Sequence, residues 1–133
     1  MTRLRLTRLR DERGSAPAEF VMVGALLTIL TLSVLQLGLA LHVRNTVLDA
    51  AAEGARYGAL ADNTGDDAVA RTRDLITTAI GAGYARDVSV GMVDYRGHPA
   101  VEVRVRTPLP LLGLVGLDDG LEVTGHAAVE TLD

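Results

Sequence analysis

The sequence contains no cysteine, no tryptophan and no lysine, and aromatic residues make up only 3% of its 133 residues. Without cysteine, the chain has no disulfide framework, no thiolate nucleophile and no cysteine-ligated zinc. So few aromatic side chains are poor material for a deep ligand pocket, which argues against a small-molecule enzyme. The hydrophobic fraction is nevertheless 48%, so Ala, Leu and Val supply the apolar surface. A chain of this length allows one small domain.

The motifs of common catalytic and nucleotide-binding sites are also missing. The sequence has no G-x-S-x-G, no P-loop and no H-E-x-x-H. Its histidines, His42, His98 and His126, are far apart in sequence, and the acids of residues 62–67 lack the alternating spacing of a calcium loop. Its basic stretch has no interleaved aromatics. We therefore expect no enzymatic activity, no metal, no cofactor, no small-molecule substrate and no nucleic-acid partner.

Charge is distributed unevenly along the chain. Residues 1–14 carry five Arg and two acids, whereas the remaining residues carry eight Arg and fifteen acids. Arginines that precede an apolar segment usually hold their side of it in the cytoplasm. The pattern therefore predicts a cytoplasmic N-terminus and an acidic, extracytoplasmic C-terminal part.

The apolar segment itself runs from Phe20 to Leu41, which is 22 residues with no charge and one amide, Gln36. A helix of this length covers roughly 33 Å, enough to cross the roughly 30 Å hydrocarbon core of a bilayer. A domain this small has no room to bury a helix that is apolar on every side. We therefore interpret Phe20 to Leu41 as the transmembrane helix of a single-pass protein of the cell membrane.

A cleaved secretory signal peptide is the first alternative to this interpretation. It would release a secreted domain that starts near His42. The apolar segment exceeds the usual signal-peptide core of about 7–15 residues. Only Gly38-Leu39-Ala40 is close to a small-x-small cleavage site, and helical character continues past it.

The boundary between the basic and apolar segments carries Gly14, Ser15 and Glu19. An acid at the edge of a membrane span is costly and is by default functional. If the chain were cut after Gly14, Ser15 would present a new amine, with which Glu19 of the same or a neighbouring subunit could pair. Glu19 would also favour the positive end of the helix dipole. Pro17 would then lie in the first helical turn, where proline is tolerated.

This arrangement resembles the class III signal of type IV pilins and pseudopilins. That signal combines a short basic leader, a glycine before the cut, a glutamate at the fifth mature position and an apolar helix that is left intact. The resemblance implies that prepilin peptidase cuts between Gly14 and Ser15. The alternative is an unprocessed membrane-anchored interaction protein of a pilus or secretion apparatus, in which Gly14 and Glu19 have this spacing by chance.

The helix is expected to continue past the apolar run as an amphipathic helix, about 40 residues long from Pro17 onwards. Within the continuation, Ala50, Gly54 and Gly58 form a strip of small residues suited to close helix packing. This strip packs either on the sheet of the same chain or on a neighbouring helix in an assembly, and the sequence leaves both open.

Residues 51–58 read AAEGARYG. With Gly14, Glu19 and the apolar run, this stretch is similar to the TadE-like family, minor pseudopilins of the tight-adherence (Tad or Flp, type IVc) pilus systems. The resemblance covers residues 13–60. It implies a role in pilus assembly and cell adhesion, with the membrane, prepilin peptidase, other pilins or minor pseudopilins and the assembly platform as partners.

The remaining residues predict a small α+β domain. Residues 62–67 are turn-rich, and Asp66 or Asp67 is expected to cap a short helix over residues 69–82. Alternating apolar residues predict strands at 88–95, 100–106 and 121–130. The expected fold is α+β and pilin-like, with a long N-terminal transmembrane and amphipathic helix, a short second helix and a three-stranded antiparallel sheet.

The predicted organisation has three parts: a cleaved basic leader at residues 1–14, a long helix at 15–61 and an extracytoplasmic domain at 62–133. Residues 108–117 are apolar but are interrupted by Pro and Gly. They are too short to span a membrane. We expect a loop there that touches the membrane surface or a partner, or one that covers the core.

Overall fold

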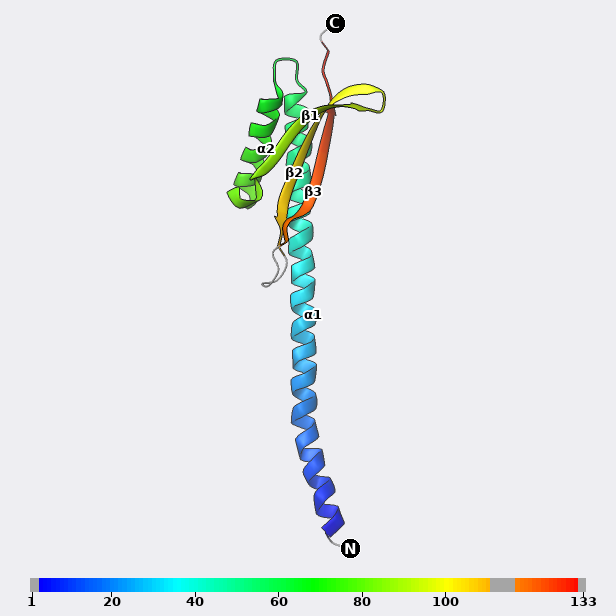
Figure 1. Cartoon of the computed structure of the whole chain (residues 1–133). Coiled ribbons are helices and arrows are strands. Elements are labelled where there is room, and N and C mark those ends of the chain that lie inside the picture. Colours follow the sequence, from blue (N-terminus) through cyan, green and yellow to red (C-terminus); the bar gives the residue numbers. More distant parts are fainter. Residues whose placement is uncertain (1–2, 111–116, 132–133) are drawn as a thin grey trace. The chain divides into compact units, whose positions relative to one another are not determined.

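The computed structural model describes residues 3–110 and 117–131, and their side chains over residues 14–110 and 120–131 (Figure 1). The elements, in chain order, are α1 (Arg3–Gly58), α2 (Gly65–Ile80), a short 3-10 helix η1 (Ala82–Tyr84), β1 (Asp87–Tyr95), β2 (His98–Leu109) and β3 (Leu117–Ala128). The chain falls into two compact units, Met1–Leu37 and Gly38–Asp133. The predicted domain limits at residues 14 and 61 stay predictions.

Helix α1 begins at Arg3, so the expectation that it starts at Pro17 is wrong. Pro17 lies inside the helix. Its missing N–H leaves the carbonyl of Arg13 without a helical partner, but good helix formers on both sides carry the helix across this position. After a cut at Gly14, Pro17 would be the third residue and would lie in the first turn.

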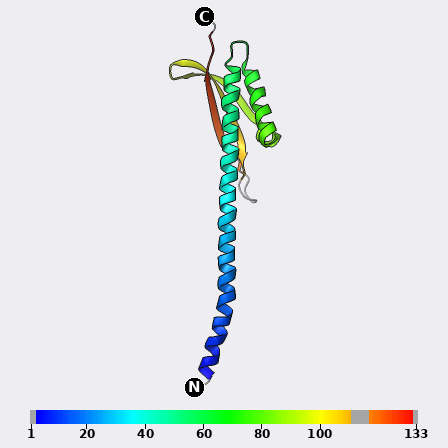
Figure 2. The same ribbon diagram turned by 180° about the vertical axis from the view of Figure 1, so that it is seen from behind.

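Within the second unit, the end of α1 and α2 lie side by side on one face of the sheet (Figure 2). The sheet has the order β1-β2-β3, and both pairs are antiparallel. Alternate residues of β2 point at the helices, and Val101, Val103 and Val105 are buried there. The α1 side of this core is formed by Val43, Val47 and small residues. The predicted α+β fold class is therefore confirmed.

Small residues set the distances between these layers. A Cβ atom at Gly54 would collide with the side chain of Thr72, and one at Gly58 would lie 2.5 Å from Cβ of Ala68. Both glycines therefore face α2, and of the two alternatives left open, packing on the sheet does not hold for Gly54 and Gly58. The sheet contacts α1 through Gly125, whose added Cβ would lie 2.5 Å from the backbone of Ala51.

Helix α2 begins after Thr64 and not at Asp66 or Asp67, so the predicted N-cap is wrong. The Thr64 hydroxyl accepts a hydrogen bond from the backbone N–H of Asp67, and the Asp67 carboxylate accepts one from the backbone N–H of Thr64. This reciprocal capping box satisfies two backbone N–H groups. Asp66 and Asp67 fall in the first turn, where their charge favours the helix dipole.

We expect Thr64→Ala to lower the free energy of unfolding by about 1 kcal/mol, because it removes the cap. Thermal unfolding of the full chain in detergent micelles measures the change. Thr78→Ala is the matched control, since Thr78 is an exposed residue of α2 and alanine is the better helix former. Equal effects of the two changes would contradict a stabilising cap.

The remaining boundaries shift by a few residues. Helix α2 spans Gly65–Ile80 and not 69–82, and β3 begins at Leu117 rather than at residue 121. Of the predicted apolar loop at 108–117, the first two residues belong to β2 and the last to β3. Residues 111–116 of this predicted loop, with its contact to the membrane, a partner or the core, lie outside the described residues.

Candidate functional site

The processing residues predicted from the sequence lie on the N-terminal half of α1. Gly14, Ser15 and Glu19 are all exposed and helical. A Cβ added at Gly14 would meet nothing within 4 Å. The described neighbours therefore leave the peptide bond after Gly14 uncovered, although a peptidase would have to unwind this turn to reach it.

The candidate membrane span follows directly. Of the described residues, one helix is long and apolar enough to cross a membrane, within Gly14–Gly58, and none of its most apolar window is buried in the chain. Phe20, Leu26, Leu30 and Leu35 are more than half exposed, as a lipid-facing surface requires. A soluble core helix would have these side chains covered.

The hydroxyl groups in this stretch are satisfied within the helix. The side chains of Thr28, Thr31 and Ser33 each donate to the carbonyl four residues earlier, at 2.8, 2.8 and 2.7 Å. A hydroxyl in hydrocarbon has no water to bond, so such internal bonds remove most of its cost. The polar residues of the segment are thus compatible with a lipid surrounding.

The small-residue strip of Ala50, Gly54 and Gly58 packs against another element of the same chain. Gly54 and Gly58 are covered by α2, and Ala50 is buried and lines a hollow with Leu75 and Ala79. The interpretation that this strip contacts a neighbouring helix stays a prediction, since such a contact would have to displace α2.

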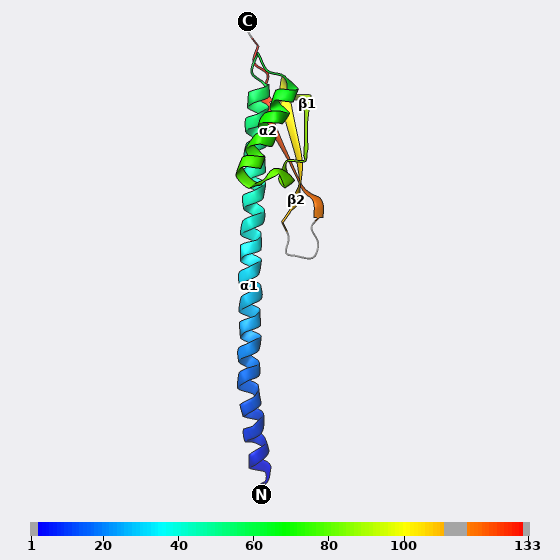
Figure 3. The same ribbon diagram turned by 90° about the vertical axis from the view of Figure 1, so that its left-hand side faces the viewer.

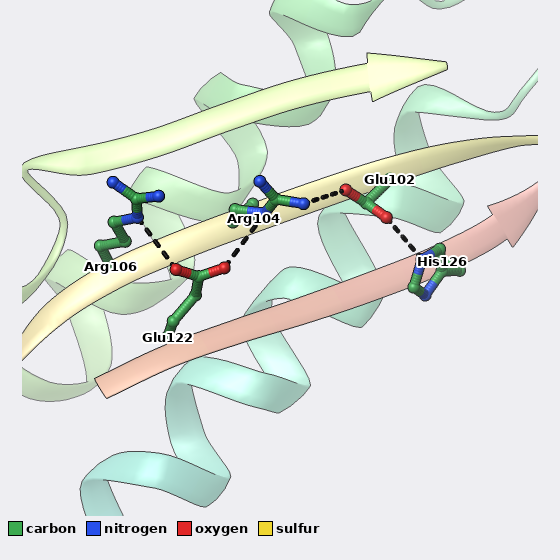
Figure 4. A network of polar contacts seen from close by, with 5 residues as sticks. All are labelled: Glu102, Arg104, Arg106, Glu122 and His126. Atoms are coloured by element: carbon green, nitrogen blue, oxygen red, sulfur yellow. Dashed lines mark hydrogen bonds and ion pairs between the residues drawn. The ribbon is translucent and has the colours of Figure 1, made fainter. Parts of the chain in front are cut away.

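A network of charged residues lies on the outer face of β2 and β3 (Figure 4). His126 Nε2 lies 2.8 Å from a Glu102 oxygen, and the other Glu102 oxygen accepts a hydrogen bond from Arg104 at 3.0 Å. Glu122 lies between Arg104 and Arg106 at 3.3 and 3.0 Å. The ring of His126 also stacks on Tyr95, with centroids 4.6 Å apart.

This network was not found from the sequence. Strict alternation in β2 does place Glu102, Arg104 and Arg106 on one face, but their partners on β3 depend on the strand register. Two arginines balance two glutamates. Glu122, Arg104 and Arg106 are 44–50% exposed, and exposed ion pairs contribute little to stability, whereas Glu102 and His126 are partly buried. These contacts join side chains of β2 to side chains of β3 on the outer face of the sheet.

These features define a class of protein: a small α+β domain built on the continuation of one candidate membrane-spanning helix. A family model described as TadE-like protein matches residues 14–56, so this segment is TadE-like and the resemblance predicted from the sequence is confirmed. The match starts at Gly14 and ends within the AAEGARYG stretch. It indicates a protein associated with a Tad pilus. No curated protein and no solved structure matches the chain.

Proposed function

We propose that the chain is the precursor of a minor pseudopilin-like component of a Tad pilus system. Prepilin peptidase would cut it between Gly14 and Ser15, on the cytoplasmic side of the membrane. The mature protein would stay in the membrane through Phe20 to Leu41 and present its α+β domain outside. It acts by assembly with other pilins, minor pseudopilins and the assembly platform, and we expect no catalysis.

One observation carries this proposal: a TadE-like segment that begins at Gly14 and is continuous with an exposed apolar helix. The basic residues before Gly14 support a cytoplasmic leader. Glu19 supports the assembly step, because a carboxylate at the edge of hydrocarbon is stabilised by a cationic partner. The new amine of Ser15, on the same or a neighbouring subunit, is such a partner.

The test is the intact mass and N-terminal sequence of the protein purified from membranes, with and without prepilin peptidase. We expect a start at Ser15 that depends on this enzyme. A retained leader would assign the chain to the unprocessed membrane anchors. A start near His42, with a domain that stays soluble without detergent, would show that the apolar run is a signal peptide.

A further inference from the structure

Strand β1 forms one edge of the sheet, and its hairpin tells which of its backbone groups are unpaired. Arg96 and Gly97 both have positive φ, 53° and 82°, as a two-residue type I′ turn requires. The flanking residues, Tyr95 and His98, are register partners and form a hydrogen-bonded pair. Bonding then alternates along the ladder, because the β1–β2 register has no shift.

It follows that the odd-numbered residues of β1 bond to β2 and the even-numbered ones direct N–H and C=O at the open edge. These are Val88, Val90, Met92 and Asp94. Among the described residues, no backbone group outside the sheet bonds to them. Between Val88 and Val93 the edge has no proline and no charged side chain, which are the usual protections of an edge strand; Asp94 is the first charge along it.

An apolar groove of about 520 Å³ opens beside this edge, between β1, the α1–α2 connection and the residues after β3. Its apolar lining includes Leu60, Val90, Met92, Val101 and Val129. Met92 is 65% exposed and Leu60 is 46% exposed, so apolar surface faces water here. Val90 and Met92 therefore contribute both the free backbone edge and part of the groove. An added strand would place alternate side chains over the groove.

Acidic residues outnumber basic ones around the groove, although Arg56 lines an adjoining hollow together with Leu60 and Glu130. Glu130 is among the lining residues, and Asp62 and Asp66 are each next to a lining residue. None of the three takes part in an ion pair within the described part of the chain. The lining includes no Arg. Charge complementarity therefore favours a basic occupant.

We propose that the β1 edge and this groove bind an extended, basic peptide segment of a partner protein by strand addition. Its backbone would pair with Val88, Val90 and Met92, and apolar side chains at every second position would enter the groove. A single strand fits this edge better than a second copy of the chain does. Helix α2 packs next to β1 at the edge of the domain (Figure 3). If two copies paired through their β1 strands, their two α2 helices would meet where the sheets join.

The test uses a labelled peptide with the sequence of residues 100–107, AVEVRVRT, and the full chain in detergent micelles. This peptide alternates Val with polar residues, carries two Arg and one Glu, and copies the strand that β1 already pairs with. We expect saturable binding by fluorescence anisotropy. Amide hydrogen exchange should slow at Val90 and Met92 but not at Gly91 and Val93, which already bond to β2.

Two variants make the result specific. Met92→Pro removes an N–H that points outward and leaves the β1–β2 ladder intact, so it should weaken binding about tenfold or more, which is about 1.4 kcal/mol. Leu60→Arg, outside the strand, should weaken it similarly by placing a cation beside the basic peptide. Ser89→Ala, on the opposite face, is the matched control and should bind normally.

The proposal would be overturned if the peptide showed no saturable binding. It would also be overturned if both variants bound the peptide as tightly as the unchanged chain. Self-association of the chain that Met92→Pro abolishes while the peptide does not bind would overturn it as well, because this result would assign the edge to a second copy. The test needs neither prepilin peptidase nor an assembled pilus. Its failure would therefore leave the proposed function untouched.

Discussion

Gly125→Ala is expected to destabilise the folded α+β domain by about 3 kcal/mol or more, a large part of the stability of a small domain. The added Cβ would lie 2.5 Å from the backbone C of Ala51 and N of Ala52, and 2.6 Å from the Ala51 carbonyl oxygen. Backbone atoms of a helix cannot turn aside as a side chain can. The sheet would have to move away from α1 and lose packing around Val123 and Val47.

Thermal unfolding of the full chain in detergent micelles measures this loss. Gly91→Ala is the matched control, because Gly91 also lies in the sheet but an added Cβ meets nothing within 4 Å. Alanine there should be neutral or slightly stabilising, since glycine weakens a strand. A similar loss of stability in both variants would mean that the contact between Gly125 and α1 is not as close as described.

Glu19→Ala is expected to abolish incorporation into the pilus system while the amount of protein in the membrane stays unchanged. The carboxylate lies next to the apolar run and is exposed, so its removal costs the single chain nothing. What the variant would lose is the proposed pairing with the new amine of Ser15. We expect Glu19→Gln to behave in the same way, because the amide keeps the size but not the charge.

Co-purification of the tagged protein with other pilus components measures its incorporation. Membrane fractionation measures the amount of protein in the membrane. Glu53→Ala is the control on the same helix, where an exposed acid lies 3.8 Å from Arg56 and beside a shallow hollow between α1 and α2. It should assemble normally. Normal pili with Glu19→Ala would count against the pseudopilin proposal and favour an unprocessed anchor.

The sequence predicts the long apolar helix and the strands well because both depend on local patterns. A run of 22 uncharged, mostly apolar residues and the Val alternation of β2 can be recognised without the rest of the chain. The predicted N-cap of α2 was wrong although the sequence contains a signal for the observed one. Thr64 and Asp67 have the spacing of a capping box. Asp66 and Asp67 are also good capping residues, so the local sequence did not single out Thr64.

Other features depend on tertiary contacts that local patterns do not specify. Gly54 and Gly58 indicate that another element packs closely against this part of α1, but they do not tell whether that element is a sheet or a helix. The pairing of Glu102 with His126 joins residues 24 positions apart and follows only from the register of β2 and β3. The unpaired edge of β1 likewise requires the strand order and the turn type.

Helix α1 contains both the candidate membrane segment and part of the domain core, and this continuity has a mechanical consequence. Phe20 to Leu41 and the buried Val43 and Val47 belong to one uninterrupted helix, without a loop between them. If the apolar segment spans a bilayer, a force that pulls on it would reach Val43 and Val47 through helical backbone, because no loop lies between them among the described residues. Extraction from the membrane and unfolding of the domain become competing responses to the same pull.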